Sequence, residues 1–188
     1  MKNEIDKAFE ITKKEKRPAL ISFTVAGDNT NKKSFEILKS ISNTVDIAEW
    51  GIAFNCPGAD GPEIQNSSYR AIKNGITLDS TFSLIKKYKK LKNSKPLILM
   101  GYYQLIYNYG EKKFIKKCKN VGVAGLIVVD LPWPDNRSFA KLCKKNSICF
   151  VQLIAPTTTT KRMKLIVKDS HQLIYQVSNV NITGGKLK

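Results

Sequence analysis

Two acidic side chains stand where acid–base chemistry is possible. Glu49 lies near the end of the apolar run Asp46–Ile52, and Asp60 lies in the glycine- and proline-rich segment that follows. If the run is a strand, Glu49 shares a face with Ile47 and Gly51, and an apolar setting there would raise its pKa and keep a proton available. Asp60, in a loop, is expected to be hydrated and ionised. A paired surface glutamate and a turn-forming aspartate are the plain alternatives.

Metal chemistry is not expected from the other candidate ligands. The cysteines form no CxxC pair and only one histidine occurs, whereas a zinc site needs such ligands clustered at short spacing. We therefore expect reduced, partly buried thiols and no metal. The side chains concerned are Cys56, Cys118, Cys143, Cys149 and His171.

The formal net charge of +17 comes mainly from lysine, because 28 lysines accompany only 4 arginines. Nucleic-acid sites favour arginine and interleaved aromatic side chains. No such motif occurs, so we expect a solvated basic surface and no nucleic-acid partner, with polyanion binding as the last-ranked alternative. No apolar run of about 18 residues occurs, so no membrane span is expected. The charged N-terminal segment does not resemble a secretory signal, which favours a cytoplasmic location.

Short runs rich in Ile, Val and Leu alternate with amphipathic segments along the chain. Apolar runs that do not alternate strictly are typical of parallel strands buried on both faces. The expected strands are Leu20–Val25, Asp46–Ile52, Pro96–Gly101, Gly125–Val129, Ile148–Leu153 and Gln172–Val177. The expected helices are Lys32–Ile41, Leu78–Leu91, Glu111–Asn120, Asn136–Lys145 and Thr160–Val167.

This regular alternation predicts an α/β fold with a parallel sheet, either doubly wound or closed into a barrel. The dinucleotide fingerprint GxGxxG and the phosphate loop GxxxxGK[ST] are both absent. Polar and glycine-rich segments follow the strands instead, which favours a (β/α)8 TIM barrel. A complete barrel takes about 250 residues, so we expect residues 1–188 to form a single domain with about six of the eight β/α units, without the last two.

One stretch is more distinctive than the rest. Residues 46–65 read DIAEWGIAFNCPGADGPEIQ, a strand ending in Glu, a hydrophobic residue and Gly, followed by a loop ending in ADGPxIQ. This pattern resembles the alpha subunits of tryptophan synthase, and further similar segments follow in the same order. They are SFTVAGD (22–28), LMGYYQ (99–104), GVAGLIVVDLP (122–132), APTTTTKR (155–162) and IYQVSNVNITG (174–184).

The resemblance implies a lyase that cleaves indole-3-glycerol phosphate to indole and glyceraldehyde 3-phosphate by a retro-aldol reaction. It places Asp60 at the indole nitrogen, where a carboxylate stabilises developing positive charge. It makes Glu49 the general acid/base, serving C3 of the indole and the glycerol hydroxyl. The residues that it implies for substrate binding are Phe23, Ile64, Met100, Tyr102, Ile127, Tyr175, Thr183 and Gly184.

The resemblance also implies a partner. In the family the alpha chain binds no cofactor and works with a beta subunit that carries pyridoxal phosphate, in an alpha-beta-beta-alpha heterotetramer. Three positions near the expected contact depart from the family pattern, namely Ala53, Cys56 and Gln104, and only Gly184 is left of the family's phosphate-binding cluster. A rival hypothesis is therefore a degenerate, non-catalytic subunit that binds and stabilises or activates the beta subunit.

Overall fold

Parallel strands form the centre of the computed structural model, which describes residues 3–178. The larger sheet has the order β1-β2-β3-β4-β5, and a smaller sheet pairs β6 with β7. Each of these pairings is parallel, as expected. The bounds are β1 (Ile21–Val25), β2 (Ile47–Gly51), β3 (Leu97–Gly101), β4 (Gly125–Val128), β5 (Cys149–Phe150), β6 (Gln152–Ile154) and β7 (Ile174–Gln176).

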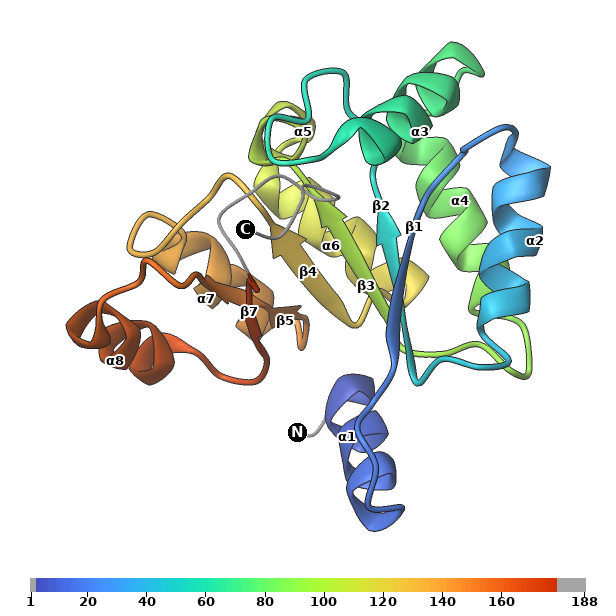
Figure 1. Ribbon diagram of the computed structural model, residues 1–188. Coiled ribbons are helices and arrows are strands. Elements are labelled where there is room, and N and C mark those ends of the chain that lie inside the picture. Colours follow the sequence, from blue (N-terminus) through green and yellow to red (C-terminus); the bar gives the residue numbers. More distant parts are fainter. Residues whose placement is uncertain (1–2, 179–188) are drawn as a thin grey trace.

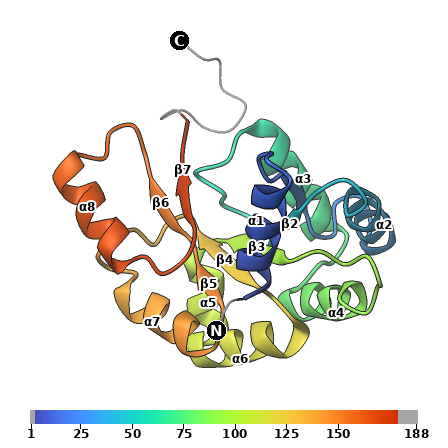
Figure 2. The same ribbon diagram turned by 90° about the horizontal axis from the view of Figure 1, so that it is seen from below.

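The strand expected over 148–153 is divided between the two sheets. β5 pairs with β4, whereas β6 pairs with β7. The amide of Val151 still donates to the carbonyl of Leu126 at 2.9 Å, and the next amide, of Gln152, donates to the carbonyl of Leu173 at 3.3 Å. The chain thus changes partner at residue 151, and the wall of parallel strands continues from β5 to β7 (Figure 2).

Helices surround this wall. Those that were expected, α2, α4, α6, α7 and α8, lie around the outside of the strands (Figure 2). None of the described helices is long and apolar enough to cross a membrane. The helix bounds are α1 (Glu4–Lys14), α2 (Asn31–Ile41), α3 (Pro62–Lys73), α4 (Leu78–Tyr88), α5 (Tyr103–Tyr109), α6 (Glu111–Val121), α7 (Arg137–Lys145) and α8 (Thr160–Asp169).

Three helices, α1, α3 and α5, are additional to the expected ones. α3 begins at Pro62, inside the segment expected to be a loop, because proline's fixed φ suits the first helical turn and Gly61 supplies an extended N-cap. α1 begins at a capping box in which Asn3 and Asp6 bond reciprocally. Figure 1 shows α3 and α5 at the carboxyl ends of the strands and α1 at their amino ends.

Apolar side chains pack in two clusters, one on each side of the strands. The outer cluster lies between strands and helices and includes Trp50 and Phe114. The inner cluster includes Ile47 and Ile98, and α1 adds Ile5 to it as a floor. Because side chains alternate along a strand, the inward face of β2 carries the odd-numbered positions 47, 49 and 51.

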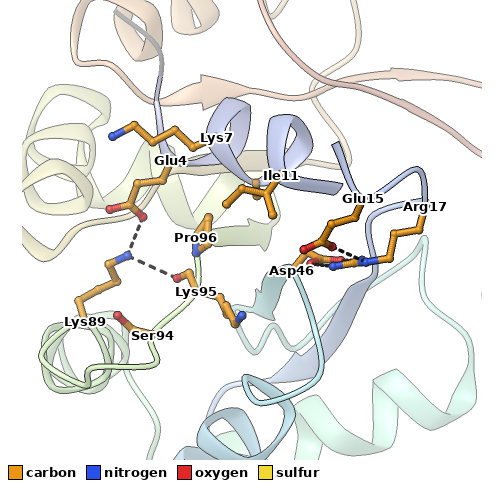
Figure 3. A pocket seen from close by; sticks show the side chains of 11 residues that line it. Glu4, Lys7, Ile11, Glu15, Arg17, Asp46, Lys89, Ser94, Lys95 and Pro96 are labelled. Carbon is orange, nitrogen blue, oxygen red and sulfur yellow. Dashed lines mark hydrogen bonds and ion pairs between the residues drawn. The ribbon is translucent and has the colours of Figure 1, made fainter. Parts of the chain in front are cut away.

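At the amino ends of the strands, ion pairs link α1 to the end of α4 and the turn after α1 to the residue before β2. Lys89 Nζ lies 2.6 Å from a Glu4 carboxylate oxygen, and Arg17 Nη1 lies 2.7 Å from Asp46 Oδ2 (Figure 3). These residues line a hollow of about 520 Å³. Its lining precedes β2 and β3, so it lies at the opposite end of the strands from the candidate site.

Candidate active site

Glu49 points into the barrel interior from β2. It pairs in register with Phe23 of β1 and Ile98 of β3, and only 7% of the residue is exposed. Burial raises the pKa of its carboxyl group from 4.5 to about 7, because few water molecules can solvate the charged form. The inward direction and the raised pKa predicted from strand alternation are both confirmed.

Asp60 differs from the expectation of a hydrated loop carboxylate. Only 5% of the residue is exposed. The hydroxyl of Tyr102 donates to Asp60 Oδ2 at 3.0 Å and accepts from the amide of Ala59 at 3.1 Å. Burial raises the Asp60 pKa, and the hydrogen bond from Tyr102 lowers it by a smaller amount. The expectation was wrong because the loop folds back onto a residue that follows β3.

The two carboxyl groups share one cavity at the carboxyl ends of the strands. Its volume is about 240 Å³. Apart from the two acids and a tyrosine, its lining is apolar, which suits a flat aromatic ring held beside an acid–base pair. The lining residues are Glu49, Ala59, Asp60, Met100, Ile127, Val129, Leu153, Tyr175 and Val177.

The predicted substrate-binding residues divide into three groups. Met100, Ile127 and Tyr175 line the cavity that holds both acids, and Tyr102 contacts it through Asp60. Phe23 and Ile64 line a neighbouring cavity of about 250 Å³. Thr183 and Gly184 lie outside the described residues.

Four further apolar residues line the cavity that were not predicted, and one of them, Ala59, directly precedes Asp60 in the loop. Val129 and Val177 lie two positions beyond Ile127 and Tyr175. Strand alternation applied one step further along each run would have found them, because it places positions two apart on one face. Leu153, on β6, depends on the division of the fifth expected strand.

No group of three or more His, Cys, Asp or Glu side chains within residues 3–178 could hold a metal ion. Three of the cysteines are buried free thiols, and Cys56 is exposed in the loop after β2. Burial raises the pKa of the Cys149 thiol to about 11, so it stays protonated and unreactive at neutral pH.

Comparison with known proteins supplies the family. The family model described as tryptophan synthase alpha chain matches residues 9–188. The tryptophan synthase alpha chain of Pelagibacter ubique (strain HTCC1062) is 59% identical over 184 residues, covering 98% of this chain and 69% of the relative. That of Thermoanaerobacter sp. (strain X514) is 38% identical over 185 residues, covering 98% of this chain and 70% of the relative.

Solved structures agree with the sequence relatives. Tryptophan synthase subunit alpha from Legionella pneumophila superposes with a TM-score of 0.90 at 30% identity, covering 95% of this chain and 68% of that one. A tryptophan synthase complex from Pyrococcus furiosus gives a TM-score of 0.80 at 35% identity, covering 84% and 65%. The expected fold class, a (β/α)8 barrel of which this chain forms part, is confirmed. The chain belongs to the tryptophan synthase alpha chain family, a lyase family of tryptophan biosynthesis.

Proposed function

We propose that the chain catalyses the retro-aldol cleavage of indole-3-glycerol phosphate to indole and glyceraldehyde 3-phosphate, with Glu49 and Asp60 as its catalytic residues. One observation carries the proposal: the two carboxyl groups converge on a single, mostly apolar cavity of about 240 Å³. An indole ring needs an apolar slot, and its cleavage from a glycerol side chain needs one group to move a proton and another to hold charge.

The chemistry asks two things of Glu49. A proton must reach C3 of the indole ring, and the hydroxyl on the adjacent glycerol carbon must lose its proton as the C–C bond breaks. The bonding electron pair returns to the ring, so indole keeps the added proton and the side chain leaves as an aldehyde. A carboxyl group with a pKa of about 7 can give and take protons near neutral pH, and such catalysis typically contributes 10²–10⁴-fold.

Asp60 is assigned to the ring nitrogen. Protonation at C3 leaves positive charge on the N1–H group, and a carboxylate beside it stabilises that charge. This role needs the ionised form. The hydrogen bond from the Tyr102 hydroxyl favours ionisation, since it is donated to Oδ2 and lowers the Asp60 pKa against the effect of burial.

Substrate contacts extend the same proposal. The residues assigned to substrate binding are Phe23, Ile64, Met100, Tyr102, Ile127, Tyr175, Thr183 and Gly184. The apolar members of this set that line the cavity support an aromatic ligand. The proposal also treats residues 1–188 as one domain, working in the cytoplasm.

A beta subunit is the proposed partner, in an alpha-beta-beta-alpha assembly. A related structure from Pyrococcus furiosus is described as a tryptophan synthase a2b2 complex. In this chain the loop after β2 presents Asn55 and Cys56 to solvent at the same end as the cavity, beside α5. Pyridoxal phosphate belongs to the beta partner in this proposal, and the alpha chain needs no cofactor for the acid–base steps.

Indole release from indole-3-glycerol phosphate tests the proposal, measured with and without a beta subunit. Glu49→Gln and Asp60→Asn should each lower kcat by about 10²–10⁴-fold. Glu63→Gln is the matched control, because Glu63 is an exposed carboxylate on the neighbouring α3. Unchanged turnover in both site variants would contradict the catalytic assignment, and activation of the beta subunit without any indole release would favour the non-catalytic alternative.

A further inference from the structure

We propose that Gly51 is a positioning residue for this reaction, because its missing Cβ lets the Phe23 ring lie across the inner face of β2 beside Glu49. The proposal rests on the function proposed above. It adds a residue that contacts neither the substrate nor the reacting atoms but fixes the position of the Phe23 ring beside Glu49.

The strand register brings these three residues together. Phe23 of β1 is directly opposite Glu49, and Gly51 follows two positions later on β2, on the same inward face. A Cβ built on Gly51 would lie 2.6 Å from Cζ and 2.8 Å from Cε2 of the Phe23 ring. Ordinary carbon–carbon contacts are about 3.5–4.0 Å, so the ring occupies the space that any other residue at position 51 would fill.

Phe23 connects the surroundings of Glu49 with a second cavity. It is the register partner of Glu49, which lines the cavity that also holds Asp60, and it lines the other cavity, of about 250 Å³. The second cavity is partly polar, since Asp28 and Ser34 also line it. In this proposal the ring limits the access of water from the second cavity to the Glu49 carboxyl group.

A side chain at position 51 would displace the ring without breaking the fold. No left-handed φ restricts Gly51, so alanine can adopt its backbone conformation. The clash is with the far end of the Phe23 side chain, which is half-buried and adjoins an empty cavity that can receive it. The expected consequence is a displaced Phe23 ring and better access of water to Glu49.

Displacement of the Phe23 ring would change the Glu49 pKa, which general destabilisation of the fold would not do. Burial alone raises the Glu49 pKa, so added water should lower it towards its ordinary value. The other titratable groups at the cavity are Asp60 and Tyr175, which line it, and Tyr102, which bonds to Asp60. None of them is moved by a methyl group at position 51, because the clash involves only Phe23.

The neighbouring strand provides a matched control. Gly101 is a buried glycine at the end of β3, but a Cβ there would meet Ile52 Cδ1 at 3.0 Å. Ile52 belongs to the outer cluster, so Gly101→Ala crowds the helix side of the sheet rather than the cavity. Both variants make the same chemical change at equivalent strand ends.

The experiment compares Gly51→Ala, Gly101→Ala, Phe23→Ala and the double variant Gly51→Ala/Phe23→Ala. We expect Gly51→Ala to lose about tenfold to a hundredfold in kcat/KM, the usual cost of a misplaced group, while Gly101→Ala stays near the unsubstituted chain. The double variant should be no less active than Phe23→Ala alone, because without the ring no clash remains. An NMR titration of the Glu49 carboxyl carbon should show a lower pKa in Gly51→Ala and an unchanged one in Gly101→Ala.

Equal losses in the two glycine variants, or additive losses in the double variant, would overturn the proposal. An unaltered Glu49 titration in Gly51→Ala would overturn it as well. If the unsubstituted chain releases no indole, the proposed function fails, and the titration still decides whether Gly51 and Phe23 control the Glu49 environment.

Discussion

Ionisation of Glu49 should cost the folded chain stability as the pH rises. The carboxyl group has a pKa of about 7 in the folded chain against an ordinary 4.5, with burial as the cause. Between these two values the folded state binds more protons than the unfolded state, so the free energy of unfolding falls with increasing pH. At 1.36 kcal/mol per pKa unit, the loss across the window from 4.5 to 7 is about 3 kcal/mol.

The variant Glu49→Gln isolates the contribution of Glu49 ionisation to the free energy of unfolding. Glutamine has nearly the shape of a protonated glutamic acid and cannot ionise, so the variant should match the unsubstituted chain at pH 4.5. At pH 8 it should be more stable by about 3 kcal/mol. Urea unfolding followed by circular dichroism at both pH values measures the difference, and the other carboxylates cancel because they are present in both proteins.

The control is Glu36→Gln on α2, whose side chain is 53% exposed. It should show no comparable pH-dependent gain, because an exposed carboxylate is solvated in both states. The reasoning would be refuted if Glu49→Gln changed the free energy of unfolding equally at pH 4.5 and pH 8. That result would mean that the folded chain solvates the Glu49 charge as well as water does.

Two further changes test the surrounding contacts. Tyr102→Phe removes the hydrogen bond that lowers the Asp60 pKa, so the acid limb of the pH profile of kcat/KM should move to higher pH. On that limb kcat/KM should fall roughly tenfold, for a bond of ~1.5 kcal/mol. The control Tyr107→Phe, at an exposed position, should leave the profile unchanged. Asp46→Asn breaks the bidentate contact with Arg17 that holds the Asp46 pKa at about 2, so unfolding by urea at pH 7 should cost about 1–2 kcal/mol less, and this difference should shrink as the pH falls from about 4 towards 2.

Much of the fold follows from local sequence patterns. A strand buried on both faces needs a continuous apolar run, and each run expected on that basis is a strand or, over 148–153, two. The division at Val151 could not be predicted, because it reflects a change of hydrogen-bonding partner and not a change in side-chain type. α3 was not predicted, because the ADGP segment has the composition of a turn. Pro62 is instead the first residue of the helix, a position that proline favours.

In the candidate site, too, features set by local sequence could be predicted, whereas features set by distant contacts could not. The setting of Glu49 could be predicted because a strand fixes the direction of each side chain from its neighbours in sequence. That of Asp60 could not, because its burial depends on Tyr102, which arrives from the end of a different strand. A loop's composition indicates how it can turn, but its hydration depends on what packs over it.

The two acids therefore differ in hydrogen bonding and not in exposure. Both are buried, and burial raises the pKa of each. Asp60 accepts a hydrogen bond that favours its charged form, whereas desolvation is the sole cause of the shift at Glu49. In a shared, mostly apolar cavity, a proton is held more firmly by the carboxyl group to which none of residues 3–178 donates a hydrogen bond. Glu49 is thus the group suited to carry the proton, and Asp60 the group suited to hold the charge that its transfer creates.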